Sequence, residues 1–330
     1  MFTDHVSDAI KNGGEIEQVA TRNGFGEGLL EAGKRDEQVV ALCCDLTEST
    51  KTHLFANEFP ERFVQIGVAE QNLASVASGM AAMGKIPFIT SYAMFSPGRN
   101  WEQIRTTIAY NNANVKIVGS HAGVSVGPDG ATHQAIEDMA IMRAVPNMTV
   151  IAPADVHEAR KVTLAAAKHE GPIYFRLGRS NTSVVTTEET EFEIGKAQVM
   201  FSRDESLEKK VGIISTGSLL YNALMAAQEL QTAGIGVTVL HMATIKPMDT
   251  EAVAKLAAEH DAILTVEEHQ VAGGMGSAVA EFLSATNPTK ISMIGIQDQF
   301  GQSGEPDELI AHYGMDVPSI VAAAQKLIQN

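Results

Sequence analysis

Residues 119–138 read GSHAGVSVGPDGATHQAIED, a glycine-rich loop that carries titratable side chains. A strand-like run over 115–119 leads into this loop, and a helical pattern begins near Gln134. The titratable side chains are those of His121, Asp129 and His133. Because α/β proteins place ligand chemistry on loops at the carboxyl ends of buried strands, the stretch predicts an α/β fold with a ligand site in this loop.

The residues alone allow three interpretations of His121, Asp129 and His133. A zinc site is disfavoured, because the chain has no H-x-x-x-H or H-E-x-x-H spacing and no thiol close by in the sequence. Ordinary loop roles fit as well, since Pro128-Asp129-Gly130 is a turn signal and Thr132 a suitable helix cap. We favour the third interpretation, in which the imidazoles and the carboxylate supply the donors and acceptors that sugar hydroxyls and phosphate need.

Upstream, residues 67–72 read GVAEQN and place one carboxylate, that of Glu70, at the start of a helix predicted over 70–83. The rest of this helix is small and apolar, which would let a neighbouring subunit approach closely. Glutamate in the first turn of a helix is favoured by the helix dipole alone, so position 70 by itself does not demand chemistry.

Two further groups of residues are candidates for ligand contacts. Tyr92 and Phe95 are spaced so that both rings can face one flat heterocycle, although core packing explains them equally well. Arg22, Ser49 and Arg179 are candidate phosphate ligands, because guanidinium and hydroxyl groups donate hydrogen bonds to phosphate oxygens. An acidic chain that binds phosphorylated compounds must concentrate positive charge locally.

Strand and helix patterns alternate over residues 21–180, after an irregular leader predicted over 1–20. Apolar strands that alternate with amphipathic helices predict a mostly parallel sheet flanked by helices. The strands are predicted at 38–44, 63–68, 86–91, 115–120, 148–152 and 172–177, and helices at 70–83, 98–112 and 155–169.

A polar, acidic stretch with little periodicity is predicted as a linker over 181–205. A second alternation over 206–330 predicts a smaller domain of the same class. Its strands are predicted at 211–215, 236–242, 261–267 and 290–296, and its helices at 218–232, 249–259, 274–285 and 316–328. We interpret His269 in Glu267-Glu268-His269 as structural, and expect this domain to serve assembly.

A chain of 330 residues is long enough for two α/β domains. The net charge of −16, with no basic run, argues against binding of nucleic acid. The only cysteines, Cys43 and Cys44, are adjacent at the end of an apolar run and are interpreted as buried thiols. There is no pattern of a signal peptide and no apolar run long enough to span a bilayer, so we expect a cytoplasmic protein that does not bind membranes.

From about Thr21 to the end, these motifs resemble the C-terminal half of a transketolase, a pyrimidine-binding domain followed by a C-terminal domain; GPDGATHQ at 127–134 is the most specific signal. The resemblance implies that Glu70 activates thiamine diphosphate, by a hydrogen bond from its shielded carboxyl group to the aminopyrimidine. It implies cofactor contacts from Tyr92, Phe95 and Leu46. It implies a substrate site made of Arg22, Ser49, His121, Asp129, His133 and Arg179, with Glu70, Asp129 and His133 catalytic and none of these a metal ligand.

The sequence departs from the family pattern in two respects. Where the family often has a third aromatic ring, this chain reads Ser96-Pro97-Gly98, and Trp101 is a candidate replacement. The chain also lacks the N-terminal half, whose Gly-Asp-Gly motif binds the metal and the diphosphate. The resemblance therefore implies one subunit of a split transketolase, in an α2β2 heterotetramer whose N-terminal-half subunit holds the diphosphate and Mg²⁺ or Ca²⁺.

The implied activity is transfer of a two-carbon ketol unit from a ketose phosphate to an aldose phosphate. Asp129 would bind the C2 hydroxyl of the acceptor, and His133 would stabilise a developing oxyanion. Three alternatives differ in specific features. The β subunit of a 2-oxo acid dehydrogenase does not keep the GPDGATHQ motif in this form, and a deoxyxylulose phosphate synthase usually has an arginine near position 121. A non-catalytic regulatory paralogue would not need to keep Glu70, Asp129 and both histidines.

Overall fold

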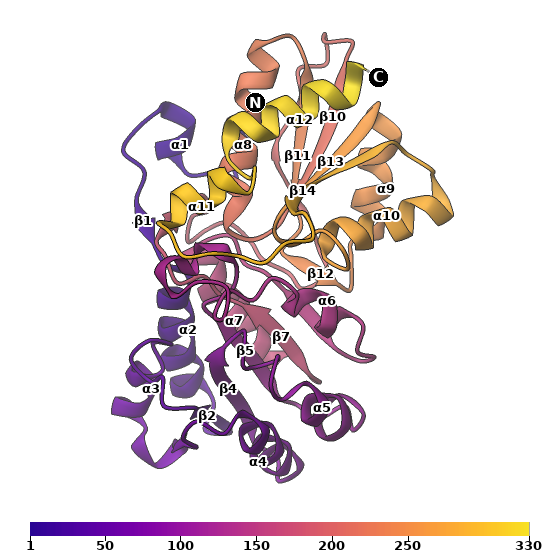
Figure 1. Ribbon diagram of the computed structural model, residues 1–330. Coiled ribbons are helices and arrows are strands. Elements are labelled where there is room, and N and C mark those ends of the chain that lie inside the picture. Colours follow the sequence, from indigo (N-terminus) through magenta and orange to yellow (C-terminus); the bar gives the residue numbers. More distant parts are fainter. Residues whose placement is uncertain (330) are drawn as a thin grey trace.

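The computed structural model describes residues 1–329 and shows two main sheets, one above the other, each flanked by helices (Figure 1). Within these residues the first sheet has seven strands in the order β12-β6-β7-β5-β4-β2-β3. The strands are β2 (Val39–Cys43), β3 (Phe63–Gln65), β4 (Ile86–Tyr92), β5 (Lys116–Ser120), β6 (Thr149–Ile151), β7 (Ile173–Arg176) and β12 (Thr244–Lys246). All neighbours pair in parallel except β12 with β6, which confirms the predicted fold class.

The helices that flank the first sheet include α2 (Thr21–Arg35), α3 (His53–Glu58), α4 (Glu70–Ala82), α6 (Asp138–Arg143) and α7 (Val156–Lys168). Helices α2 and α7 approach each other closely, which explains the glycines of α2. A Cβ atom at Gly24 would lie 1.9 Å from the carbonyl oxygen of Val156, and one at Gly28 would lie 2.9 Å from that of Arg160. Glycine is therefore required on this face despite its low helix propensity.

Two helix predictions in this domain are wrong in detail. The helix expected over 98–112 is replaced by a short helix α5 (Trp101–Gln103) and a π-helical segment η2 (Ile104–Ala109). The helical pattern near Gln134 does not continue as a helix until α6 begins at Asp138, so Thr132 is not a helix cap. The intervening residues form a loop after the 3₁₀ segment η3 (Val124–Asp129).

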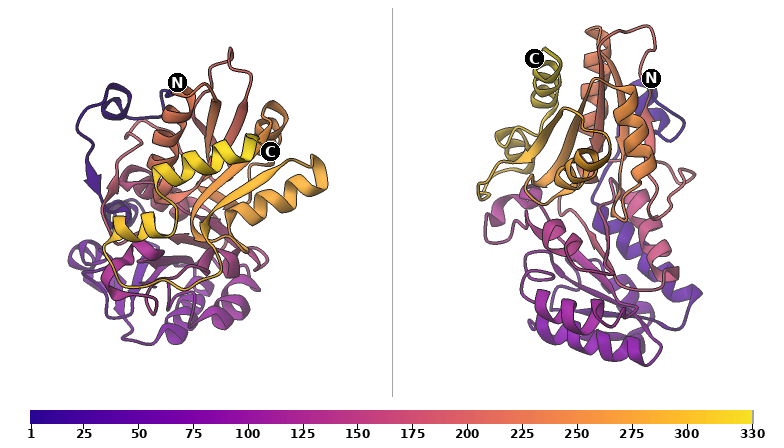
Figure 2. Two further views of the ribbon diagram at one scale, coloured as in Figure 1. Left: turned by 45° about the horizontal axis from the view of Figure 1, so that its top comes forward. Right: turned by 90° about the vertical axis from the view of Figure 1, so that its right-hand side faces the viewer.

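The second sheet, in the described part of the chain, has five strands in the order β14-β13-β10-β11-β9. They are β9 (Gln198–Phe201), β10 (Lys210–Ser215), β11 (Gly236–His241), β13 (Ala262–Gln270) and β14 (Ile291–Ile296). Only β9 runs antiparallel to its neighbour. The helices are α8 (Leu220–Thr232), α9 (Thr250–Glu259), α10 (Met275–Thr286), α11 (Pro306–His312) and α12 (Val317–Gln329). Helices α8 and α12 cover one face, and α9 and α10 the other (Figure 2).

The segments predicted as leader and linker contain regular structure. Residues 1–20 include α1 (Asp8–Asn12) and β1 (Gln18–Val19), and β1 pairs antiparallel with β8 (Thr182–Ser183). Strand β9 also lies inside the predicted linker and belongs to the second sheet. The ring of Phe2 contacts the ring of Phe201 with centroids 5.2 Å apart. These pairings join residues far apart in the sequence, so local periodicity does not reveal them.

The second half of the chain contributes an edge strand to the first sheet. This strand is β12, which pairs with β6. Cys43 and Cys44 are buried free thiols, as predicted. Among residues 1–329, no helix combines the length and apolar character that crossing a membrane requires.

Candidate functional site

Glu70 is the first residue of α4, and its side chain is only 2% exposed. Helix α4 forms here because Leu73, Ala74 and Ala77 recur at helical spacing and pack into the core. The Glu70 carboxylate accepts a hydrogen bond at Oε1 from Ser91 Oγ, 3.2 Å away, at the end of β4. A buried carboxylate needs such donors to offset the loss of water.

Arg99, which the sequence analysis missed, lies over Glu70. Its Nη1 donates to Glu70 Oε2 at 2.6 Å, while its side chain stays 47% exposed. The same guanidinium lies 4.7 Å from the centroid of the Phe95 ring. Next to it, Asn100 Nδ2 donates to the carbonyl oxygen of Glu70 at 3.0 Å. The only sequence signal was the Arg-Asn pair directly after Ser96-Pro97-Gly98, on the loop after a buried strand.

The predicted aromatic residues and histidines lie together. The Tyr92 ring stacks on the His121 ring, with centroids 4.0 Å apart and an interplanar angle of 23°. Phe95 meets His133 edge-on at 5.4 Å, and Tyr92 lies 6.4 Å from the same histidine. This grouping follows from the sheet, because Tyr92 pairs with Ser120 at the carboxyl ends of β4 and β5. The first residues of both loops therefore share one edge.

His121 is held as a neutral imidazole. Burial lowers its pKa to about 3, and the positive charges of Arg22 and Arg179 act in the same direction. Its backbone adopts a left-handed conformation with φ of 56°, directly after β5. Its Nδ1 lies 2.8 Å from Ser120 Oγ. A neutral ring here can donate one hydrogen bond and accept another.

Arg22 of α2 and Arg179, which follows β7, form a cationic cluster beside His121. The pKa of Arg22 is lowered by burial and by the neighbouring charge of Arg179. Arg22 Nη1 donates to the backbone carbonyl of Ser49 at 2.8 Å, and Arg179 Nη1 donates to that of Val126 at 3.0 Å. The contact of Ser49 with the cluster is thus through its carbonyl oxygen. Two guanidinium groups that repel each other form a suitable site for an anion.

The remaining candidates are less tightly held. Asp129 is exposed at the end of η3, and His133 is half-buried with its Nδ1 3.0 Å from Thr132 Oγ1. Leu46 is half-buried in the loop after β2, where its carbonyl oxygen accepts a hydrogen bond from Thr50 Oγ1 at 2.9 Å. This hydrogen bond lies within the loop that carries Leu46 and involves its backbone rather than its side chain.

Trp101, the candidate replacement for the missing third ring, forms a hydrogen bond with α6. Its Nε1 donates to the carbonyl oxygen of Ile141 at 3.0 Å, and the side chain packs against the core of the first domain. Within residues 1–329, no group of three or more His, Cys, Asp or Glu side chains is placed to hold a metal ion.

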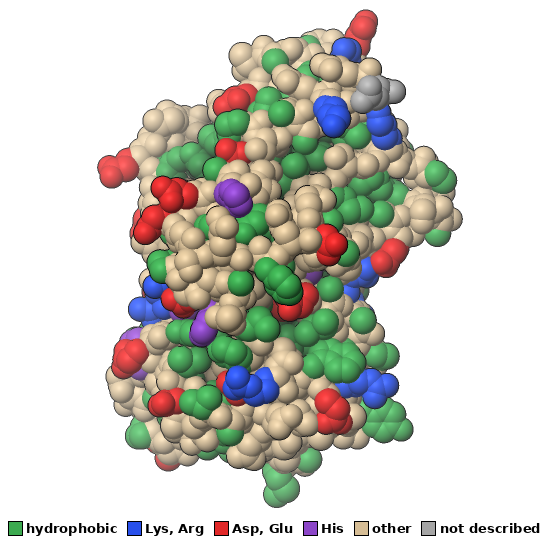
Figure 3. Space-filling model, viewed as in Figure 1, with side chains coloured by type: hydrophobic (Ala, Val, Ile, Leu, Met, Phe, Trp, Pro, Cys, Tyr) green, Lys and Arg blue, Asp and Glu red, His purple; other side chains and the backbone are tan. Residues whose placement is uncertain are grey.

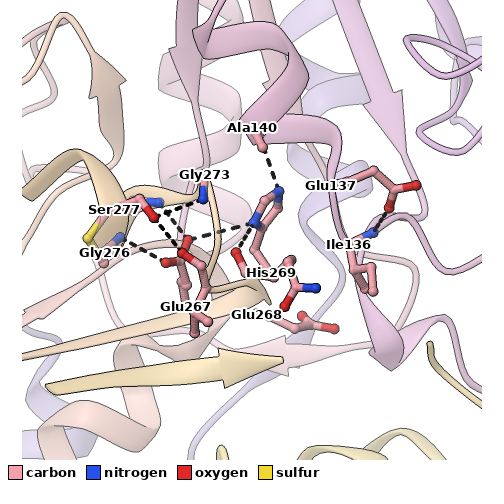
Figure 4. Close-up of polar contacts among 12 residues, drawn as sticks. Ile136, Glu137, Ala140, Glu267, Glu268, His269, Gly273, Gly276 and Ser277 are labelled. Atoms are coloured by element: carbon pink, nitrogen blue, oxygen red, sulfur yellow. Dashed lines mark hydrogen bonds and ion pairs between the residues drawn. The ribbon is translucent and has the colours of Figure 1, made fainter. Parts of the chain in front are cut away.

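The second domain also reaches this site, through residues that the sequence analysis assigned no chemistry. Glu268 Oε1 accepts a hydrogen bond from the backbone amide of Ser125 at 2.7 Å. Glu268 follows Glu267 on β13, and both side chains are buried at the boundary of the two domains (Figure 4). Only a long-range contact connects Glu268 to the loop, so no local pattern pointed to this residue.

Comparisons with known proteins agree with this architecture. Residues 17–184 match the family model of the transketolase pyrimidine binding domain, and residues 201–320 match that of the transketolase C-terminal domain. A protein of Methanocaldococcus jannaschii described as a transketolase C-terminal section is 47% identical over 302 residues, 91% of this chain and 93% of that one. A 6-deoxy-6-sulfo-D-fructose transketolase subunit of a Clostridium species is 38% identical over 316 residues, 96% and 97% of the two chains.

Among solved structures, a split-gene transketolase described as an inactive β4 tetramer matches with a TM-score of 0.87 and 44% sequence identity. The match covers 94% of this chain and 99% of that one. A pyrimidine-binding domain of this family implies the use of thiamine diphosphate.

Proposed function

Because this chain belongs to the transketolase family and corresponds to the C-terminal section of a transketolase, the pyrimidine-binding domain followed by the C-terminal domain, we propose that it is the C-terminal subunit of a split transketolase. The proposed reaction moves a two-carbon ketol unit from a ketose phosphate to an aldose phosphate. The observation that carries the proposal is a continuous set of contacts. At one end Arg99 joins the buried Glu70 carboxylate to the Phe95 ring, and at the other end His121 lies beside the cationic cluster. The rings of Tyr92 and His133 lie between these two ends. We propose residues 21–180 and 206–330 as the two domains.

The residues around Glu70 fit the aminopyrimidine of thiamine diphosphate. The buried Glu70 carboxyl group can hold a proton at a ring nitrogen, and Tyr92 and Phe95 supply flat apolar surfaces. Leu46 would extend that surface. When bound, this cofactor supplies a nucleophilic carbon and an electron sink for cleavage of a carbon–carbon bond beside a carbonyl group. The proposed partner subunit holds the diphosphate and Mg²⁺ or Ca²⁺.

The other end of the site fits a sugar phosphate. Arg22, Arg179 and the Ser49 loop would hold the terminal phosphate, with the neutral imidazole of His121 as a further donor. Asp129 would accept a hydrogen bond from the C2 hydroxyl of the acceptor. His133, whose ring meets the Phe95 ring edge-on, would donate to a developing oxyanion. The same cationic cluster suits a terminal sulfonate, the group in the name of the Clostridium relative.

An apolar surface near α4 supports association with a partner. Val68 and Met83, at the two ends of α4, are 71% and 83% exposed, and Tyr110, after η2, is 83% exposed. Figure 3 shows hydrophobic side chains at the lower end of the molecule, over α4 and α5. Large apolar side chains exposed at one end of a molecule are typical of an interaction surface. We propose that the N-terminal-half subunit covers this surface in an α2β2 heterotetramer.

Substitution of Arg179 tests the phosphate end of the site. Arg179→Ala is expected to raise KM for phosphorylated substrates by about 10-fold or more while kcat changes little, since a hydrogen bond to a charged group is lost on binding. Steady-state kinetics of the enzyme assembled with its partner measure both constants. Arg35→Ala, which removes an arginine paired with Glu31 on the exposed side of α2, is the control and should leave KM unchanged. An equal loss for an unphosphorylated ketose would contradict the assignment.

A further inference from the structure

The loop of residues 121–133, here called the substrate loop, is built against the second domain. Its glycines mark the points of closest approach. A Cβ atom at Gly123 would lie 2.2 Å from Glu268 Oε1, and one at Gly130 would lie 2.7 Å from Ser303 Oγ. Both glycines also have positive φ angles, which other residues adopt at a cost. The conformation of the loop therefore depends on side chains from the other half of the chain.

Glu268 makes the most direct of these contacts. Its Oε1 accepts a hydrogen bond from the Ser125 backbone amide at 2.7 Å, and its Oε2 accepts one from Ser218 Oγ at 3.2 Å. Its own carbonyl oxygen accepts a hydrogen bond from Arg176 Nη1 at 2.7 Å. Burial raises the pKa of Glu268, whereas the Arg176 charge and the serine donors lower it. The carboxylate thus joins the start of a helix in one domain to the substrate loop of the other.

Gln134 provides a second connection between the loop and the second domain. Its Nε2 donates to the carbonyl oxygens of Val124 at 3.0 Å and Gly127 at 3.2 Å within the loop. The same nitrogen lies 2.9 Å from the carbonyl oxygen of Gln302, in the segment that precedes α11. The loop is therefore held on both sides of Ser125.

Glu267 is a natural control for Glu268. Successive side chains of a strand point to opposite faces, and Figure 4 shows Glu267 turned toward Gly276 and Glu268 turned away from it. Glu267 accepts hydrogen bonds from the backbone amides of Met275 at 2.7 Å and Gly276 at 2.8 Å, at the start of α10. The two residues have the same side chain and the same strand, but only Glu268 contacts the substrate loop.

We propose that Glu268 is a positioning residue, which holds the Ser125 backbone so that the substrate loop presents Asp129 and His133 to the sugar. The effect on turnover rests on the proposed function, whereas the effect on loop order does not. The second domain would then contribute to the geometry of the site in addition to any role in assembly.

Hydrogen exchange of the full-length chain, with and without its partner, tests the effect on the loop. Glu268→Ala should speed amide exchange across residues 121–133 by about 10-fold or more, since a charge-assisted hydrogen bond is lost. A cavity of ≈ 30 Å³ whose lining includes Thr216, Ser218 and Glu268 lies beside the removed group, so water can enter and solvate the donors that Glu268 leaves. Glu267→Ala should instead speed exchange near the start of α10.

Kinetics of the same variants test the consequence for substrate. Glu268→Ala should lower kcat/KM by about 10-fold or more, and Glu268→Gln, which keeps an acceptor for the Ser125 amide, should restore most of it. Unchanged loop exchange in Glu268→Ala, or equal acceleration in Glu267→Ala, would overturn the proposal. If the parent enzyme does not act on sugar phosphates, the proposed function fails, yet hydrogen exchange still decides the role of Glu268.

Discussion

Glu70→Ala is expected to abolish turnover, with a fall in kcat of about 10³-fold, the size typical of lost acid–base assistance in a shielded site. The structure buries the Glu70 carboxyl group and anchors it through Ser91 and Arg99, and the Arg99 guanidinium lies 4.7 Å from the centroid of the Phe95 ring. No other carboxylate of the described residues shares these donors. Steady-state kinetics of the assembled enzyme, at saturating cofactor and substrates, measure the effect.

Two controls separate this effect from damage to the fold. Arg99 is half-exposed, so water can solvate its guanidinium once Glu70 is removed, and the melting temperature should change little. Glu102→Ala removes an exposed carboxylate of the next helix and should leave kcat at the parent value. Near-normal kcat for Glu70→Ala would show that the proposed mechanism is wrong.

Arg176→Met is expected to have the largest effect on stability, a loss of about 3–5 kcal/mol in the free energy of unfolding. Asp138 is buried, and its Oδ2 lies 3.0 Å from Arg176 Nε and accepts a hydrogen bond from the Tyr174 hydroxyl at 2.6 Å. Arg176 also donates to the carbonyl oxygens of Glu268 and Ala135. Its removal leaves a buried carboxylate without a counter-charge. Equilibrium unfolding in urea gives the free energy.

A substitution of the neighbouring tyrosine provides a reference for the size of this loss in stability. Tyr174→Phe removes one hydrogen bond to the same carboxylate and should cost about 1.5–3 kcal/mol. The double variant Arg176→Met with Asp138→Leu should recover part of the loss, because replacing both members of a buried ion pair by apolar residues is often tolerated. A cost for Arg176→Met no greater than that for Tyr174→Phe would contradict this explanation.

Much of the fold could be predicted because buried parallel strands are continuous apolar runs. The run at 38–44 became β2, and the pattern over 70–83 became α4. The helix predicted over 98–112 failed because the chain forms i→i+5 hydrogen bonds over Ile104–Ala109, and this segment is too short for apolar spacing to distinguish a π-helix from an α-helix. The pairing of β1 with β8 joins the start of the chain to the predicted linker, a contact that no local window contains.

The candidate site was predictable where it lies at strand ends. Tyr92 is the last residue of β4, and His121 directly follows β5, the neighbouring parallel strand. Their contact therefore follows from the order of the strands. Arg99 and Glu268 could not be found in this way. Arg99 reaches Glu70 across a turn whose shape the sequence does not reveal, and Glu268 reaches Ser125 from another domain.

The central claim is that this chain is one half of an active transketolase. The most direct test mixes it with the N-terminal-half subunit, thiamine diphosphate and Mg²⁺, and follows glyceraldehyde 3-phosphate release from xylulose 5-phosphate plus ribose 5-phosphate. We predict turnover only when both chains are present. Turnover or tight cofactor binding by this chain alone would contradict the split-subunit account, and decarboxylation of a 2-oxo acid without ketol transfer would contradict the assignment as a transketolase.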